Sequence, residues 1–315
     1  MRIFANPNYN FIKWRWHALI LSLAIIWTGV AMMWLRGGLP LGIDFSGGTA
    51  IVVKFAQATS EDVVRKALDP VSADKVVQQY GDPAQHQVMI RLPMMKGQEE
   101  GANLEAGVNQ VSDALKAANL EVVEMPIKEL VGPTVGADLK QKGIYATLFA
   151  LGGILIYVAF RFRFTFALGA IVAAFHDILI TLVFLSWFHY ELSLNIIAAI
   201  LTITGYSVND TIVVFDRVRE NQRLMRREPL DQIVNKSVNQ TLGRTIITSG
   251  CTLLAVLALY LFGGEVLRGF AFTMLIGVVT GTYSTVFIAA AIAIILSRRP
   301  PSQAAMPPQV RAKRA

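Results

Sequence analysis

The chain of 315 residues has a single cysteine, Cys251, and few charged side chains. One thiol excludes an internal disulfide and any metal or redox motif built from several cysteines. Charged residues make up 16% of the chain, whereas soluble globular domains carry about 25%. Because the uncharged residues gather in long runs, the sequence excludes an ordinary soluble enzyme, a disordered chain and a coiled coil.

Hydrophobic residues make up 54% of the chain and form six runs that reach or nearly reach the length of a membrane span. A helix needs about 20 apolar residues to cross the hydrocarbon core of a bilayer. The first run is longer than the apolar part of a signal peptide and ends without a small-residue cleavage site, so we expect a retained helix. The six runs are 18–35, 143–160, 164–187, 192–215, 244–262 and 269–297.

Lysine and arginine are unevenly divided between the two sides of these runs. They gather before the first run, between the second and third, after the fourth and in the tail, whereas the alternate short connections contain only Arg268. Basic loops mark the cytoplasmic side of a membrane, so we expect both termini in the cytoplasm. The net charge of +7 is therefore a topology signal, and we expect no nucleic-acid partner.

One long segment, residues 37–140, follows the first run and lies on the outer side in this topology. It holds 14 acidic and 9 basic residues, a balance opposite to that of the whole chain. A segment of this length is a folded domain rather than a connector. Strand patterns occur at 49–55, 75–80, 87–92 and 121–130, and helical patterns follow the first and third of these. The order βαββαβ predicts a ferredoxin-like domain.

The predicted fold is a polytopic α-helical membrane protein with six transmembrane helices and one extracytoplasmic ferredoxin-like α+β domain between helices 1 and 2. The connection between helices 2 and 3 is a tight hairpin, because only three residues separate their apolar runs. The expected parts are a cytoplasmic N-terminus (1–16), helix 1 (17–36), the periplasmic domain (37–140), a five-helix membrane domain (141–297) and a basic cytoplasmic tail (298–315).

Three residues of the kinds Asp, Glu, Lys and Arg, namely Asp177, Asp210 and Arg244, fall inside predicted spans. Charge inside a bilayer is costly and marks a candidate functional site. With a rise of about 1.5 Å per residue, Asp210 and Arg244 come to similar depth on consecutive antiparallel helices, where they could pair. A carboxylate that gains and loses a cationic partner releases and binds a proton in turn, while the arginine keeps its charge.

We therefore predict proton coupling at Asp210 and Arg244, with Asp177 and Asn209 as further candidates. The alternative for the first pair is a static buried ion pair. For Asp177 the alternative is a structural contact with the neighbouring His176. Asn209 adjoins Asp210, and polar side chains in membrane helices more often pack than carry protons.

Four stretches in order resemble the SecF family of protein-export membrane proteins. The first is GIDFSGGT at residues 42–49, directly after helix 1. The second is GYSVNDTIVVFDRVREN at 205–221, which contains Asp210. The third comprises TLGRT at 241–245 and TSGCTLLAVLALYLFGG at 248–264, and the fourth is GTYSTVFIA at 281–289. The resemblance covers nearly the whole chain and is specific, because all four stretches occur on one topology.

The resemblance implies one half of a SecDF complex of the resistance-nodulation-division superfamily. Such a complex uses the proton gradient to promote preprotein translocation through, and release from, the SecYEG channel in the bacterial inner membrane. The implied partners are SecD, SecYEG, the translocating preprotein and membrane lipid, with YajC as a further candidate. The transmembrane aspartate and arginine of the family correspond to Asp210 and Arg244.

The GIDFSGGT segment, with Gly42, Asp44, Gly47 and Gly48, is interpreted as a structural hinge or base for the outer domain. It lacks the GxxxxGK[ST] spacing of a phosphate loop. We expect no enzymatic activity and no cofactor, because the sequence contains no catalytic triad, metal cluster or nucleotide loop. Two alternatives remain, a stand-alone proton-driven exporter of small molecules or lipids and a static membrane scaffold. The exporter would need a second six-helix half, and the scaffold would need no buried charge.

Overall fold

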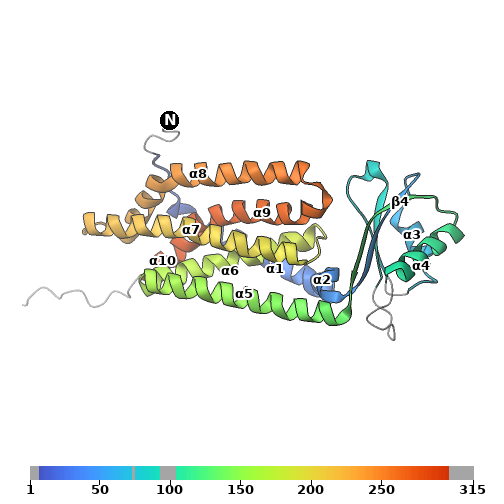
Figure 1. The fold of residues 1–315 in the computed structure, drawn as a ribbon. Coiled ribbons are helices and arrows are strands. Elements are labelled where there is room, and N and C mark those ends of the chain that lie inside the picture. Colours follow the sequence, from blue (N-terminus) through green and yellow to red (C-terminus); the bar gives the residue numbers. More distant parts are fainter. Residues whose placement is uncertain (1–6, 73–74, 93–103, 298–315) are drawn as a thin grey trace, which may run out of the picture.

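The computed structural model describes residues 7–72, 75–92 and 104–297, so the predicted tail and the first six residues lie outside the described residues. The molecule is elongated, with a bundle of long helices at one end and a small domain of strands and helices at the other (Figure 1). The chain passes between the two parts twice, through the short helix α2 (Ile43–Ser46) on the way out and from strand β4 into helix α5 on the way back.

Six helical segments of the bundle are long and apolar enough to cross a membrane. This confirms the predicted number of spans. The last one is continuous but contains a π turn, η3. They are α1 (Arg15–Leu35) with the 3-10 turn η1 (Ile12–Trp14), α5 (Pro133–Arg161), α6 (Phe164–Trp187), α7 (Leu194–Leu224), α8 (Leu230–Phe262), and α9 (Gly264–Ser284) with η3 (Thr285–Ala289) and α10 (Ala290–Ser297).

The six spans differ in how much of each the rest of the chain covers. In the most apolar window, 56% of α6, 50% of α7 and 67% of the last span is buried, against 17%, 11% and 17% for α1, α5 and α8. Small residues allow the close contacts at the centre. A Cβ added at Gly277 of α9 would overlap the side chain of Ile203 of α7. Hence α6, α7 and α9 form the centre, while α1, α5 and α8 keep faces open to lipid or another protein.

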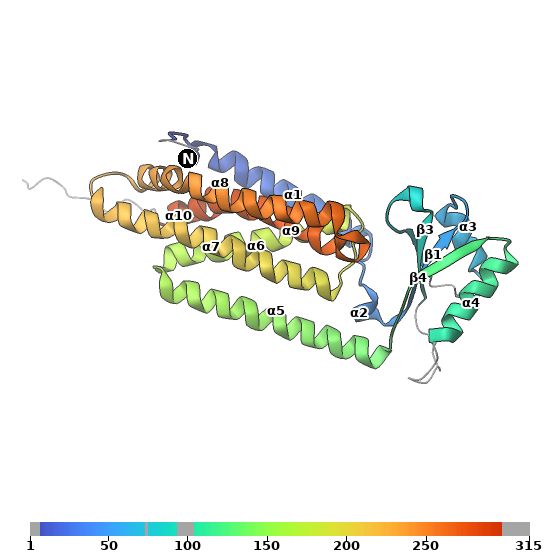
Figure 2. The same cartoon turned by 45° about the horizontal axis from the view of Figure 1, so that its top comes forward.

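The outer domain confirms the predicted ferredoxin-like arrangement. Its four strands pair in the order β2-β3-β1-β4, and every pair is antiparallel. Helix α3 (Glu61–Ala67) joins β1 to β2 and α4 (Leu104–Ala117) joins β3 to β4. Both helices lie on the face of the sheet that points away from the bundle (Figure 2). The strands are β1 (Gly48–Phe55), β2 (Val76–Gln79), β3 (Gln87–Leu92) and β4 (Val122–Val131).

Alternation along the strands builds the core of this domain. Ile51 and Val53 of β1 and Ile90 of β3 are fully buried against α3 and α4, because successive strand residues point to opposite faces. Val64 and Leu115 complete this core from the two helices. The opposite face of the sheet points toward the membrane bundle (Figures 1 and 2).

Candidate functional site

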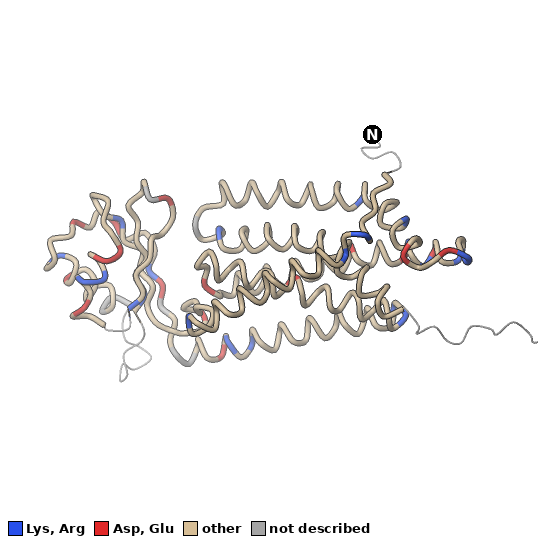
Figure 3. The backbone as a smooth tube through the Cα atoms, turned by 180° about the vertical axis from the view of Figure 1, so that it is seen from behind, with Lys and Arg blue, Asp and Glu red and all other residues tan. Residues whose placement is uncertain are grey.

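Charged residues are concentrated in the outer domain and at the ends of the bundle, which leaves the middle of the helices nearly uncharged (Figure 3). Asp210 on α7 is one exception, with 8% of its surface exposed. Its Oδ1 accepts a hydrogen bond from Thr245 Oγ1 of α8 at 2.7 Å. Its Oδ2 is buried and has no hydrogen-bond partner among the described residues. An ionised carboxylate is costly there, because one of its oxygens faces neither water nor a donor.

Arg244 and Asn209 occupy a different face of the same two helices. Both side chains are exposed in the isolated chain. Within the described residues, no ion pair of 4 Å or less joins Arg244 to Asp210, and Thr245 takes the position at the carboxylate instead. The structure thus brings the predicted pair onto neighbouring helices without direct contact. Two polar groups within the apolar helices are therefore exposed in the isolated chain.

Asp177 on α6 is held differently from Asp210. It is 1% exposed, and its Oδ2 accepts hydrogen bonds from Ser207 of α7 at 2.5 Å and Ser284 of α9 at 2.8 Å. Its Oδ1 lies 3.0 Å from His176 Nδ1. Both carboxylate oxygens therefore have partners, and the side chain ties together the three central helices. The predicted contact with His176 is present as one of these three.

A row of buried hydroxyls on α8 was not predicted as part of the site. The row lies against α7, and its members follow one another at four-residue intervals, which places them on one helix face. Thr245 bonds to Asp210, Ser237 accepts from Asn221 Nδ2 at 2.8 Å, and Ser249 accepts from Tyr206 at 3.4 Å. The spacing was visible in the sequence, but serine and threonine in membrane helices usually only pack. The row comprises Ser237, Thr241, Thr245 and Ser249.

The GIDFSGGT segment is fastened to the start of α7. Asp44 Oδ2 accepts the backbone N–H of Leu194, the first residue of that helix, at 2.9 Å. A carboxylate in this position satisfies a free N–H and interacts favourably with the positive end of the helix dipole. The backbone N–H of Gly42 donates to Leu192 O at 2.7 Å. Gly47 and Gly48 have φ of 67° and 121°, a conformation that glycine adopts most readily.

A second contact joins the outer domain to the same part of the bundle. Arg91 of β3 forms an ion pair with Glu191, which lies in the connection between α6 and α7, and the two side chains are 15% and 9% exposed. Burial lowers the pKa of Arg91 to about 10, against the opposing influence of Asp44 and Glu129. Arg91 therefore stays charged at neutral pH. The contact was not predicted, because the sequence does not show that an arginine in a strand and a glutamate in a distant loop lie next to each other.

A cavity of about 790 Å³ lies between the face of the sheet opposite α3 and α4 and the ends of α6, α7 and α9 that are nearest the outer domain. Asp44, Arg91 and Glu191 all line it. The Asp44 cap and the Arg91–Glu191 ion pair thus attach the start of α7 to the outer domain around this cavity. The middle of the same helix carries Asp210. Together these features define a multi-pass membrane protein whose outer domain is tied to a central helix.

The chain belongs to the SecD/SecF family of protein-export membrane proteins. Residues 110–299 match the family model described as protein export membrane protein SecD/SecF, C-terminal. Residues 35–59, which include the GIDFSGGT segment, match the SecD/SecF GG motif. The resemblance seen in the sequence is thereby confirmed.

Curated relatives cover nearly the full length of the chain. It is 42% identical over 292 residues to protein translocase subunit SecF of Escherichia coli O157:H7, covering 92% of this chain and 88% of that protein. It is 43% identical over 309 residues to protein translocase subunit SecF of Rhodothermus marinus, covering 95% and 96%. The same-named protein of Koribacter versatilis is 38% identical over 373 residues, with 92% of each covered.

Solved structures support the fold and its arrangement. The crystal structure of SecDF, a translocon-associated membrane protein from Thermus thermophilus, matches with a TM-score of 0.81 and 35% identity over 93% of this chain. The chain spans 39% of that SecDF chain. SecDF in its super-membrane-facing form matches with a TM-score of 0.66 at the same identity and coverage. The arrangement of this chain is therefore closer to the first structure, and the likeness supports a role in SecDF-type protein translocation.

Proposed function

We propose that the chain is the SecF-type half of a SecDF complex, which uses the proton gradient to promote preprotein translocation through and release from the SecYEG channel. The observation that carries the proposal is Asp210. Its carboxylate is buried within a predicted span, and one of its oxygens has no donor among the residues that the structure describes. The helix that carries it begins at the outer domain, where Asp44 caps it.

The proton-binding step takes place at Asp210 Oδ2. Thr245 holds Oδ1, so an incoming proton has one free oxygen to bind. Protonation makes the carboxyl group neutral and removes the cost of a buried charge. Arg244 directly precedes Thr245 on α8. Movement of α8 against α7 brings its guanidinium to the carboxyl group, which then releases its proton, because a nearby cation favours the charged form.

The start of α7 passes such a movement on to the outer domain. Displacement of α7 acts on Asp44 through the Leu194 N–H and on Gly42 through the backbone of Leu192. The Arg91–Glu191 ion pair joins the same junction to β3. A preprotein in contact with the outer domain is thereby pulled when Asp210 exchanges its proton.

The partner within the complex is a second helical half, SecD. Polar side chains in membrane spans face a protein interior or water rather than lipid. Asn209 and Arg244 are exposed in the isolated chain, so an adjoining protein surface is expected over them. SecYEG and YajC are further partners in this proposal. The chain lies in the inner membrane with both termini in the cytoplasm, and it performs no enzymatic reaction and binds no cofactor.

The proposal is tested with the variant Asp210→Asn in cells that depend on this chain for efficient export. We expect the complex with SecD to assemble in pull-down experiments and the stimulation of export to be lost. Asp216→Asn is the matched control, since it makes the same change on the same helix at a half-exposed ion pair with Arg161. If Asp210→Asn exports as well as the wild type, proton coupling at Asp210 is wrong and the static scaffold is the better account.

A further inference from the structure

We infer that the cytoplasmic end of the bundle carries a binding site for the headgroup of an anionic phospholipid. The site is a cavity of about 1140 Å³ between the segment that leads into α1, the end of α7 and the start of α8. The term cytoplasmic rests on the orientation given under the proposed function, but the site is separate from Asp210 and from the outer domain.

The wall of the cavity is held in place by two asparagine side chains of α8. Asn239 accepts the N–H of Tyr9 at 2.9 Å and donates to the carbonyl of the same residue at 2.8 Å. Asn235 accepts the N–H of Phe11 at 2.9 Å and donates to Tyr9 O at 3.1 Å. The segment before α1 is thus fixed along α8, which makes the cavity a built feature rather than a gap between loops.

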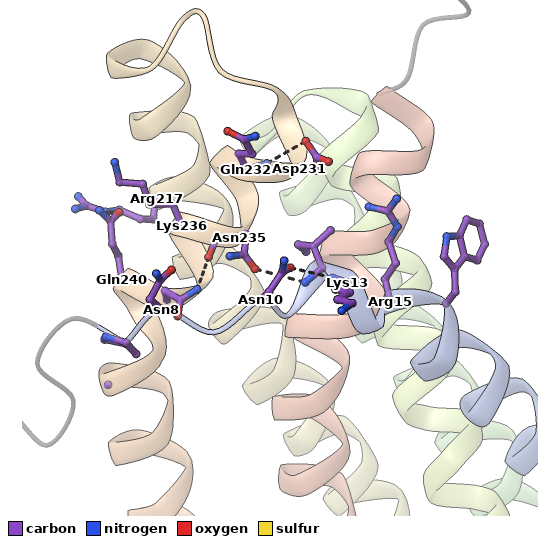
Figure 4. A pocket seen from close by; sticks show the side chains of 15 residues that line it. Asn8, Asn10, Lys13, Arg15, Arg217, Asp231, Gln232, Asn235, Lys236 and Gln240 are labelled. Carbon is purple, nitrogen blue, oxygen red and sulfur yellow. Dashed lines mark hydrogen bonds between the residues drawn. The ribbon is translucent and has the colours of Figure 1, made fainter.

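The charge in the cavity is mostly positive. Four basic residues line it, Lys13, Arg15, Arg217 and Lys236, against one acidic residue, Asp231. Arg217 donates hydrogen bonds to Glu220 at 2.6 Å and to Gln240 at 2.7 Å. The other three cations form no ion pair within the described part of the chain. Figure 4 shows Arg217 and Lys236 on one side of the cavity, Lys13 and Arg15 on the other, and Asn10 and Asn235 between them.

The surroundings favour a lipid over a soluble anion. The cavity includes Trp16, which is 53% exposed at the start of α1, and Ile20 one turn further on is 65% exposed. On α8 the cavity ends at Gly243, and the exposed Ile246 and Ile247 follow. Headgroup-level tryptophan, basic side chains and apolar helix faces are the combination that a membrane interface presents. Basic pockets between transmembrane helices on the cytoplasmic side bind anionic headgroups.

The test uses the purified complex of this chain with SecD and native mass spectrometry in the presence of phosphatidylglycerol or phosphatidylethanolamine. We expect the wild type to retain phosphatidylglycerol in preference to phosphatidylethanolamine. The double variant Lys13→Gln/Lys236→Gln is expected to bind phosphatidylglycerol about 30-fold more weakly, the effect of removing two cations from an anionic surface. The charge-preserving variant Lys13→Arg/Lys236→Arg is expected to bind as the wild type does.

Arg219→Gln/Arg223→Gln is the matched control, because both arginines are exposed on the same end of α7 and neither lines the cavity. It is expected to bind phosphatidylglycerol normally. Equal loss in the control, or no loss in Lys13→Gln/Lys236→Gln, overturns the inference. Inorganic phosphate that binds as tightly as the lipid overturns it in favour of a soluble anion. A cross-link from Asn8→Cys, made in a Cys251→Ser background, to SecD in a lipid-free complex overturns it in favour of a SecD segment.

Two readouts keep this inference apart from the proposed function. Asp210→Asn is expected to bind phosphatidylglycerol like the wild type, so lipid binding stands even if Asp210 proves irrelevant to export. Labelling of Asn8→Cys by a membrane-impermeant thiol reagent is expected only from the cytoplasmic side. Labelling from the outer side contradicts both the orientation and the lipid site. Loss of the lipid site alone leaves proton coupling untouched.

Discussion

Two buried aspartates on adjacent helices of this membrane protein differ in how completely the fold satisfies them. Asp177 has partners on both oxygens, drawn from its own helix, α7 and α9. Asp210 has one bond, from Thr245, and its second oxygen has none within the described chain. A fully bonded carboxylate holds helices together, whereas a half-bonded one is free to take up a proton. From this difference we expect a positioning role for Asp177 and, as proposed above, proton binding at Asp210.

The largest difference between the two aspartates is expected in the stability of their alanine variants. Asp177→Ala removes the carboxylate that Ser207, Ser284 and His176 contact at a site that is 1% exposed, and Ser284 keeps only its bond to Gly281 O. We expect a loss of about 3 kcal/mol in the free energy of unfolding, because buried donors are left unpaired. Asp210→Ala loses only the bond from Thr245, and we expect a change of about 1 kcal/mol or less. Thermal unfolding of the detergent-solubilised complex measures both, and equal losses would contradict the assignment.

The junction with the outer domain extends the comparison to the start of α7. Arg91→Gln leaves Glu191 buried without its cation, and we expect a loss of about 2 kcal/mol in stability. Amide hydrogen exchange is expected to rise at residues 188–194, because the ion pair no longer restrains this connection. Lys128→Gln on the exposed strand β4 is the control and should change neither. Unchanged exchange in Arg91→Gln would show that the ion pair does not tie the two parts together.

The smallest effect is expected for the hydroxyl beside Asp210. Thr245→Val removes its one hydrogen bond while keeping the shape of the side chain, and we expect a stability change below about 1 kcal/mol. Export stimulation is expected to fall partway, since the carboxylate loses its fixed orientation. Thr252→Val is the control, because this partly buried threonine donates to the carbonyl of Thr248 in its own helix and does not contact Asp210. Export at the wild-type level in Thr245→Val would remove Thr245 from the site.

Much of the fold was predictable because its signals are local. Six apolar runs identify six spans, and the alternation of residues such as Ile51 and Val53 identifies a strand with one buried face. Asp177, Asp210 and Arg244 stood out because charge is rare in such runs. The segment 42–49 stood out only through its resemblance to a family.

The contacts of these residues were not predictable, since they depend on how the helices are rotated. The depth estimate predicted that Asp210 and Arg244 could pair. In the structure α8 is rotated so that Thr245, not Arg244, contacts the Asp210 carboxylate. Asp44 caps a helix that begins 150 residues later, and Arg91 meets Glu191 across two parts of the molecule. One-dimensional periodicity gives the face of a helix or strand, not the partner that covers it. The proton-coupling roles of Asp210, Arg244, Asp177 and Asn209 stay predictions.

Infrared spectroscopy of the reconstituted complex of this chain with SecD, recorded as a function of pH, tests the central claim most directly. Protonated carboxyl groups absorb separately from carboxylates, so each variant reports which residue exchanges its proton. Asp210→Asn is expected to remove one pH-dependent carboxyl band of the wild type, and Asp177→Asn is expected to keep it. A band that persists in Asp210→Asn and disappears in Asp177→Asn would contradict the assignment of the two aspartates.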